Sequence, residues 1–388
     1  MDKLLYITPF FNYPPQDGAS LRAYNILKQL NNYYNIHLLT YRIDNYEPLI
    51  TWASSKKIEI HFFSTLPDYN RKSSFFQRLV SNELPGFGSH KIKEIKNDIN
   101  DVIRLKGNFN LIYFATQLMG QAALLEHWNA KLVIDLYDVY NTYHKEKVKE
   151  TPFWKPHFWL FLIETYRVKV FEKLILSKFD IIIVTNDEDK YDLENIFSFT
   201  NVSTIPSGIT PPKLVRREPT NGSILMVANY KYIANANGLI WFYSKVWPII
   251  KNHPSIHLKL VGEYTEQIKR KFLDEPNIEL FGRVEDLQEY YNKSACVIIP
   301  LKNYGGTKLK IVEAMAWGIP IISTSNGAKG VKHSDTIMIA DDPENFAKAI
   351  INILSKNTSS EVISHNTINI VKNNYTWEVI GFSLREIL

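Results

Sequence analysis

The sequence predicts an α/β protein built from two doubly wound parallel sheets. Three observations lead to this fold class. The chain has 388 residues, more than one hydrophobic core usually organises and enough for two domains. Short apolar runs alternate along it with stretches of helical apolar spacing. The alternation is interrupted by a polar, proline-bearing segment at 206–221, the only convincing interdomain linker in the sequence.

In the first half, buried strands are predicted wherever a short run of Leu, Ile, Val and aromatic residues lies between turn residues. A helix is expected at 21–30. A second, longer helical stretch at 151–176 is dense in aromatics, which we expect to pack into the domain core, with its basic residues as a solvated face. The predicted strands are 4–8, 36–40, 58–63, 111–114, 131–136, 180–185 and 202–206.

The second half restarts the same alternation. Its most informative part is 300–320, where an apolar run, a glycine pair, a helical pattern and a second apolar run predict one βαβ unit. The other strands are predicted at 224–228, 256–261, 278–281 and 336–339, and helices at 235–250, 285–293, 344–354 and 375–388.

The glycine pair Gly305-Gly306 falls at the carboxyl end of a predicted parallel strand, where open α/β sheets place their ligands. Free backbone N–H groups at the start of the following helix, together with Thr307, Lys308 and Lys310, suit a phosphate. An ordinary βαβ turn also uses glycine for its dihedral angles alone. From these residues by themselves both interpretations stay open.

Composition excludes several classes of protein. The single cysteine, Cys296, rules out a disulfide framework and a multi-cysteine metal site, and it suits a reducing compartment. A net charge of +5 is too small for a nucleic-acid binder. Neither a signal peptide nor a membrane-spanning run is visible, so we expect a cytoplasmic protein. The basic and aromatic stretch 70–96 favours a peripheral contact with an anionic membrane, at its inner face.

Five motifs then point to one family: IPSGI at 205–209, VANYKY at 227–232, LVG at 260–262, FGRV at 281–284, and GTKLK followed by EAMA within 306–316. Together they resemble the family 4 retaining glycosyltransferases of the GT-B fold, the "group 1" glycosyl transferases. The glycine-rich turn resembles that of the subgroup with a Gly-x-Gly-Thr-Lys-x-Lys motif.

This resemblance implies two Rossmann-like domains that face each other across a deep cleft. Residues 1–206, joined by the C-terminal helix at about 374–388, would bind the acceptor, and 207–373 would bind a nucleotide-sugar. The expected reaction moves a sugar from a nucleotide-diphosphate-sugar to a glycan or lipid-linked acceptor in cell-surface polysaccharide or glycoconjugate synthesis. It would be hexosyltransferase-like, retain the anomeric configuration and need neither a metal nor another cofactor.

The resemblance also assigns roles to residues of this sequence. Lys308 or Lys231 would neutralise the leaving diphosphate, Glu313 would accept hydrogen bonds from the ribose hydroxyls, and Gly18 would face the donor phosphates. The phosphates themselves would be bound by the amides of Gly305, Gly306 and Thr307, and the rest of the donor site would be supplied by Asn229 and Lys310.

Two departures from the family pattern concern the sugar. Gly305 stands where many members have a glutamate, and Tyr137 stands where many have a histidine. Asp138, beside Tyr137, is therefore the catalytic candidate in the first half. These losses leave open a non-catalytic scaffold subunit that binds a nucleotide or glycan. An epimerase or phosphorylase of the same fold is a weaker alternative, since the motifs of neither are evident.

Overall fold

The computed structural model describes two compact units, residues Met1–Ser207 with Ile380–Leu388 and residues Gly208–Val379. The sequence placed the corresponding boundaries at 206/207 and near 374. The described residues are 1–15, 17–42, 45–66, 91–212, 219–253, 255–272, 275–302, 309–333, 336–355 and 360–388.

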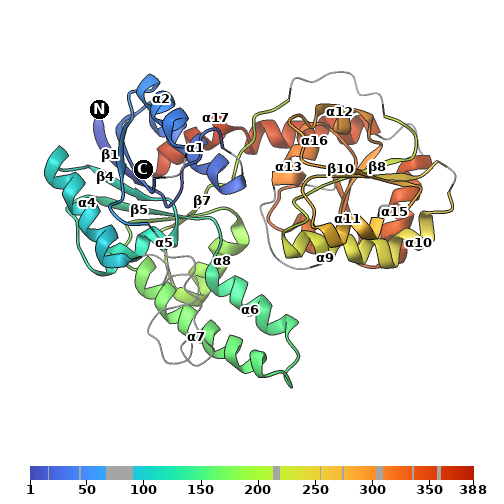
Figure 1. The fold of residues 1–388 in the computed structure, drawn as a ribbon, viewed down its shortest axis with the longest axis horizontal. Helices are drawn as coiled ribbons and strands as arrows, with labels where there is room; N and C mark the ends of the chain where they lie inside the picture. The colour runs from blue at the N-terminus through green and yellow to red at the C-terminus, as the bar shows by residue number, and fades with distance from the viewer. Residues whose placement is uncertain are drawn as a thin grey trace. The chain divides into compact units, whose positions relative to one another are not determined.

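Unit 1 is built on a seven-stranded parallel sheet in the order β3-β2-β1-β4-β5-β6-β7 (Figure 1). The strand order reverses between β1 and β4, so the carboxyl ends of these two strands form a topological switch point. The doubly wound fold predicted from the sequence is confirmed. The strands are β1 (Asp2–Ile7), β2 (Tyr34–Thr40), β3 (Glu59–Phe62), β4 (Leu111–Phe114), β5 (Lys131–Leu136), β6 (Ile181–Val184) and β7 (Val202–Thr204).

The helices of unit 1 connect these strands. Asp17 caps the first of them, because its carboxylate accepts the Ser20 N–H at 2.8 Å while the Ser20 hydroxyl accepts the Asp17 N–H. The helices are α1 (Gly18–Leu30), α2 (Glu47–Ser55), α4 (Ile92–Lys106), α5 (Gln117–Gly120), the 3₁₀ turn η1 (Gln121–Leu124), α6 (Tyr140–Glu150), α7 (Pro156–Leu176) and α8 (Asp187–Phe197).

Unit 2 has a six-stranded parallel sheet in the order β10-β9-β8-β11-β12-β13, with its switch point between β8 and β11. The strands are β8 (Ser223–Val227), β9 (His257–Val261), β10 (Ile278–Phe281), β11 (Cys296–Ile299), β12 (Ile321–Ser323) and β13 (Ile337–Ile339). The helices are α9 (Ile233–Trp241), the π-helical η2 (Phe242–Val246), α10 (Trp247–Ile250), α11 (Glu266–Phe272), α12 (Gln288–Lys293), α13 (Leu309–Ala316), α14 (Ser325–Ala328), α15 (Pro343–Ser355) and α16 (Ser360–Asn374).

The C-terminal helix α17 (Trp377–Ile387) begins in unit 2 and ends in unit 1. Within unit 1 it packs closely on α1, since a Cβ atom added to Gly381 would lie 2.5 Å from the Gln29 side-chain oxygen. The Lys131 ammonium group at the start of β5 donates to the Leu388 carbonyl at 2.7 Å. The chain end is therefore anchored on the first unit.

The βαβ unit predicted at 300–320 is confirmed as β11, α13 and β12. The predicted helix 235–250 forms, but a π-helical turn over Phe242–Val246 interrupts it. Pro248 follows this turn and has no N–H for the α-helical bond, which is a physical reason for the wider turn. The sequence analysis did not predict α16.

The expectation that the aromatics of 151–176 pack into the core is wrong for most of them. Phe153, Trp154, Trp159 and Tyr166 are between 58% and 70% exposed. The side of α7 that is buried carries residues at i, i+4 spacing instead, namely Leu160, Glu164, Val168 and Glu172. Apolar residues surround this helix, so hydrophobicity alone did not tell which side would be buried.

The hydrogen bonds of Glu172 explain why this side of α7 is the buried one. Its carboxylate accepts the backbone N–H groups of Tyr140 and Asn141 at 2.9 and 3.2 Å, and the Gln117 amide at 2.5 Å. It therefore satisfies the free N–H groups at the start of α6. Burial raises the pKa of Glu172 to about 7.

Candidate functional site

The candidate site of unit 2 lies at the carboxyl edge of its sheet, next to the switch point between β8 and β11. Two glycines allow the chain to pack closely there. A Cβ atom on Gly238 of α9 would lie 2.8 Å from the Pro300 carbonyl oxygen that follows β11. Gly262, after β9, has φ +132°, and a Cβ atom there would lie 1.9 Å from the Ala228 carbonyl oxygen. Larger residues at either position would push these connections apart.

A chain of hydrogen bonds joins the loop after β8 to the start of α13. The Lys310 ammonium group donates to the Asn235 amide oxygen at 2.6 Å. The Asn235 amide nitrogen donates to the Asn229 carbonyl at 2.8 Å. The Asn229 side chain accepts the Lys231 N–H at 3.0 Å. The structure therefore brings the predicted donor-site residues Asn229, Lys231 and Lys310 together.

Lys310 is a largely buried cation whose hydrogen-bond partner is a neutral amide. Burial lowers the pKa of Lys310 to about 8. Among the described residues, none of the carboxylates forms an ion pair with it. A bound anion would supply a countercharge, so Lys310 is the candidate anion-binding group at the start of α13.

Glu313 lies one turn along α13 from Lys310, on the same side of the helix. Its carboxylate accepts the Tyr291 hydroxyl at 3.4 Å, and Tyr291 stacks on Trp317 with ring centroids 5.8 Å apart. Burial raises the pKa of Glu313. The Tyr291 contact is long and uses one carboxylate oxygen, which leaves acceptor capacity for hydroxyl groups of a ligand.

The ammonium group of Lys231 has a carboxylate partner in this structure. Its ammonium group pairs with Glu263 at 3.0 Å, and Glu263 also lies 3.9 Å from the Arg283 guanidinium. These three residues follow β8, β9 and β10, so the ion pairs run along the same carboxyl edge. Lys231 is 59% exposed, whereas Lys310 is largely buried.

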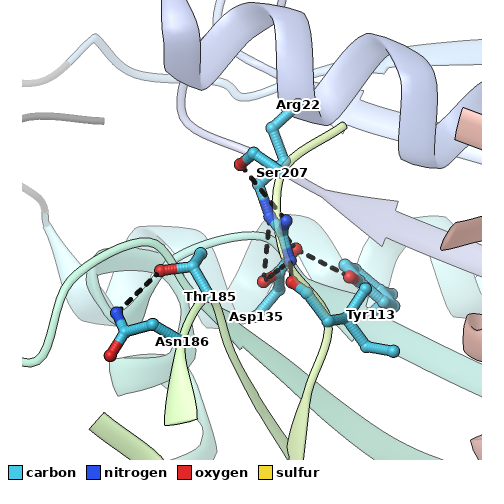
Figure 2. A network of polar contacts seen from close by, with 7 residues as sticks. Arg22, Tyr113, Asp135, Thr185, Asn186 and Ser207 are labelled. Atoms are coloured by element: carbon cyan, nitrogen blue, oxygen red, sulfur yellow. Dashed lines mark hydrogen bonds and ion pairs between the residues drawn. The ribbon is translucent and has the colours of Figure 1, made fainter. Parts of the chain in front are cut away.

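In unit 1 the carboxyl edge of the sheet holds a buried ionic network (Figure 2). The Arg22 guanidinium of α1 donates to the Asp135 carboxylate of β5 at 2.8 and 3.0 Å. The Tyr113 hydroxyl donates to the same carboxylate at 2.8 Å. Arg22 further donates to the Ile205 carbonyl at 2.9 Å and the Ser207 hydroxyl at 3.4 Å.

This network fixes the last residues of unit 1, because Ile205 and Ser207 immediately precede unit 2. Burial disfavours the charge on Arg22, but Asp135 outweighs it and the pKa of Arg22 is raised. The ion pair between these two residues was not predicted from the sequence. The signal that could have identified the pair is an aspartate inside the otherwise apolar run LVIDL.

The other predicted residues of unit 1 surround this network. Gly18 is the first residue of α1, and Asp138 lies exposed between β5 and α6. Tyr137, which replaces the family histidine, lies with its ring 5.9 Å from the Arg22 guanidinium carbon. Burial raises the pKa of the Tyr137 hydroxyl, so it stays protonated.

Four predicted residues, Gly305, Gly306, Thr307 and Lys308, lie outside the described residues. The phosphate-binding turn therefore remains a prediction. Its two flanks, β11 and the start of α13, are where the sequence placed them.

One histidine–carboxylate cluster among the described residues has metal-ligand composition: His37, Glu59 and His61. The imidazole nitrogens of His37 and His61 are 3.1 Å apart, with ring planes at 13° and centroids at 5.4 Å. This edge-to-edge arrangement is that of an N–H···N hydrogen bond between the two rings. The Glu59 carboxylate already has a cation as partner, because the ammonium group of Lys106 pairs with it. Burial lowers the pKa of His37 to about 4, which keeps its ring neutral. We interpret the cluster as a hydrogen-bonded pair.

Comparison with known proteins places this geometry in context. Residues 221–356 match the family model described as "Glycosyl transferases group 1". The chain is 30% identical over 227 residues to a 44.6 kDa protein in the cps region of Klebsiella pneumoniae, a match that covers 55% of this chain and 58% of that one. It is 32% identical over 151 residues to a glycosyltransferase of Haemophilus influenzae, covering 37% and 40%. The chain thus spans less than two thirds of either relative.

The fold is also found in solved structures. A mutant of S. aureus TarM, solved in complex with fondaparinux, alpha-GlcNAc-glycerol and UDP, superposes with a TM-score of 0.70 at 9% identity. The superposition covers 100% of this chain and 99% of the TarM chain. At this identity the likeness establishes the two-domain GT-B fold.

Proposed function

We propose that this chain, which has the GT-B fold and whose residues 221–356 match the model of the group 1 glycosyl transferases, is a glycosyltransferase. It would move a hexose-like sugar from a nucleotide-diphosphate-sugar to a glycan or lipid-linked acceptor. Unit 2 would bind the donor and unit 1 the acceptor.

The observation that carries this proposal is the largely buried ammonium group of Lys310, whose hydrogen-bond partner is the neutral amide of Asn235. A diphosphate brings the countercharge that Lys310 lacks among the described residues, and it does so at the start of a helix, where backbone N–H groups and the helix dipole favour negative charge. The predicted phosphate-binding turn of Gly305, Gly306 and Thr307 precedes this helix in sequence and would add further amides. Asn235 positions the ammonium group through its 2.6 Å contact.

Glu313 supports a nucleotide rather than a simple phosphate. One helical turn from Lys310, its carboxylate can accept hydrogen bonds from two vicinal ribose hydroxyls while Tyr291 holds it in place. In the donor the diphosphate is bonded directly to the ribose. A cation and a carboxylate that lie one turn apart on the same face of a helix could therefore bind these two neighbouring groups.

We further propose a retaining reaction without a metal ion. The bond between the anomeric carbon and the diphosphate oxygen breaks, and the acceptor oxygen forms its bond to the same face of that carbon. The acceptor proton passes to the leaving phosphate, whose growing charge is stabilised by Lys308 and Lys310. Asp138 and Gly18 would lie on the acceptor side, where the Asp138 side chain is exposed.

The setting we propose is the synthesis of cell-surface polysaccharide at the cytoplasmic face of the membrane. The relative from the cps region and the fondaparinux and glycerol-sugar ligands of TarM support an extended glycan or a lipid-linked acceptor. Most of the predicted membrane stretch 70–96 lies outside the described residues. The basic residues in its described part, 91–96, are Lys91, Lys93 and Lys96. None of the described helices combines the length and apolarity needed to cross a bilayer.

The proposal is tested by incubating the protein with a panel of nucleotide-sugars and measuring release of the nucleoside diphosphate. We expect one donor to be turned over by the wild type and not by Glu313→Ala, with the fold intact by circular dichroism. Unchanged turnover in Glu313→Ala would refute the site. Nucleotide binding without turnover of any donor, with or without glycan acceptors, would favour the non-catalytic scaffold subunit.

A further inference from the structure

The exposed side of helix α7 carries large apolar side chains along most of its length. Eight of the 21 exposed large hydrophobic side chains of the described residues fall within 153–174. Six lie on α7, and their exposed fractions are between 44% and 70%. They are Trp159, Leu162, Ile163, Tyr166, Val170 and Leu174. We call these six residues the α7 stripe.

The spacing of the α7 stripe places its members on one face of the helix. Apart from the adjacent Leu162 and Ile163, successive members are three or four residues apart, the spacing at which side chains line up along a helix of about 3.6 residues per turn. From Trp159 to Leu174 the stripe extends for about 22 Å at a rise of about 1.5 Å per residue. Phe153 and Trp154, 66% and 70% exposed, add aromatic surface in the turn before the helix.

The opposite face of α7 packs against the rest of unit 1, and this leaves the stripe exposed. Leu160, Val168 and Ile175 are buried on that face together with both acidic residues of the helix. Glu172 is held there by the amides at the start of α6, so the helix cannot rotate to bury the stripe without breaking these bonds. Figure 1 shows α6 and α7 side by side as a hairpin that extends beyond the unit 1 sheet.

The charged side chains at the surface of α7 itself are all of one sign. Because Glu164 and Glu172 are buried, the charged side chains left at the surface of α7 are cations. Arg167 and Lys169 flank the stripe, one on each side, at the positions given by about 100° per residue. Lys173 lies near its C-terminal end, and Lys155 precedes the helix.

We propose that the α7 stripe is the surface by which unit 1 docks on an anionic lipid bilayer, with the helix lying in the plane of the interface. Tryptophan and tyrosine concentrate where headgroups meet acyl chains, and the flanking lysines reach anionic headgroups. A second copy of the chain fits less well. A two-fold contact would set Arg167, Lys169 and Lys173 against the same cations, and α7 offers no surface carboxylate to pair with them.

This inference does not rest on the transferase proposal, and it assigns the membrane contact to a different segment from 70–96. Its test therefore needs neither donor nor acceptor. Wild-type protein is sedimented with vesicles of phosphatidylcholine containing phosphatidylglycerol, and with vesicles of phosphatidylcholine alone. We expect retention on the anionic vesicles, weaker retention on the neutral ones, and loss of binding as salt is raised.

Two variants with matched controls identify the surface. Leu162→Gln/Ile163→Gln/Tyr166→Gln should lower the affinity for anionic vesicles about tenfold or more. Its control, Tyr191→Gln/Ile240→Gln/Ile249→Gln, removes similar exposed side chains elsewhere and should bind like wild type. Lys169→Glu/Lys173→Glu should bind less than Lys245→Glu/Lys251→Glu, which has the same net charge.

All substituted side chains are exposed, so the variants should keep the wild-type melting temperature, and this is checked first. Wild-type protein that does not sediment with anionic vesicles would overturn the proposal. So would α7 variants that bind like their controls. A wild-type dimer that the α7 substitutions dissociate, without vesicle binding, would show instead that a second copy covers the stripe.

Discussion

The Arg22 guanidinium and the Asp135 carboxylate form a buried bidentate ion pair at the carboxyl edge of the first sheet, with side chains 2% and 0% exposed. The pair joins α1 and β5 to Ile205, so the end of the first unit depends on a charge that burial makes costly. Such a pair contributes little net stability to the fold, and its role is to hold these segments in position.

Removing one member of that pair should therefore be severe. Asp135→Asn leaves the Arg22 charge buried without a counterion and should cost about 3–5 kcal/mol in the free energy of unfolding. Arg22→Met/Asp135→Leu removes both charges and should recover part of that loss. Urea unfolding of both variants measures the difference.

The exposed pair of Asp101 and Arg104 serves as the control, with side chains 55% and 76% exposed. Asp101→Asn should change the free energy of unfolding by less than about 0.5 kcal/mol. Equal losses for Asp101→Asn and Asp135→Asn would contradict the role assigned to the buried pair.

Nucleotide affinity should depend on pH through Lys310. With the pKa of Lys310 at about 8 in the free protein, a bound diphosphate favours the protonated form and raises that pKa. The affinity for the fully ionised diphosphate should accordingly fall as pH rises through 8. Titration calorimetry in buffers of different ionisation enthalpy should detect proton uptake on binding near pH 8. No uptake would mean that the diphosphate does not contact Lys310.

Glu313 and Tyr291 should differ in their effect on binding. Glu313→Gln removes the charged acceptor proposed for the ribose hydroxyls and should weaken nucleotide binding about tenfold or more. Tyr291→Phe removes a 3.4 Å contact and keeps the ring that stacks on Trp317, so it should weaken binding by a much smaller factor. Equal losses would indicate that Glu313 acts only as a structural partner of Tyr291.

Fold stability should fall with acidification through His37. Burial lowers the pKa of His37 from 6.5 to about 4, so between these values the unfolded chain binds more protons than the folded one. Stability contributed by the neutral ring is present above pH 6.5 and is lost as pH falls toward 4. The melting temperature of His37→Asn should therefore depend less steeply on pH in this window than that of the wild type. His157→Asn, at an exposed position, should follow the wild type.

The sequence predicted the sheets well because buried parallel strands read as short apolar runs, as in the Ile181–Val184 strand. It also placed the start of α13 and the grouping of Asn229, Lys231 and Lys310. That grouping was predicted from the family motifs and their spacing, and not from hydrophobic periodicity.

Other features depend on contacts that no local pattern encodes. The burial of Glu172 rather than the aromatics of α7 follows from amides at the start of α6, which are distant in sequence. The role of Asp135 as an ion-pair partner can be recognised only when the fold places Arg22 of α1 beside it. The pairing of Lys231 with Glu263 likewise depends on where β9 ends beside β8.

The central claim is that Lys310 is held in a costly environment in order to bind a diphosphate. It is tested most directly by titrating UDP, GDP, ADP and dTDP into wild-type protein, Lys310→Met and the exposed control Lys245→Met, with the melting temperature of each measured without ligand. We predict that Lys310→Met loses binding of the preferred nucleotide about a hundredfold, while its unliganded melting temperature equals or exceeds that of the wild type, because a buried charge has been removed. Lys245→Met should match the wild type in both. Unchanged nucleotide affinity in Lys310→Met, or no binding of any of the four diphosphates to the wild type, would contradict the account.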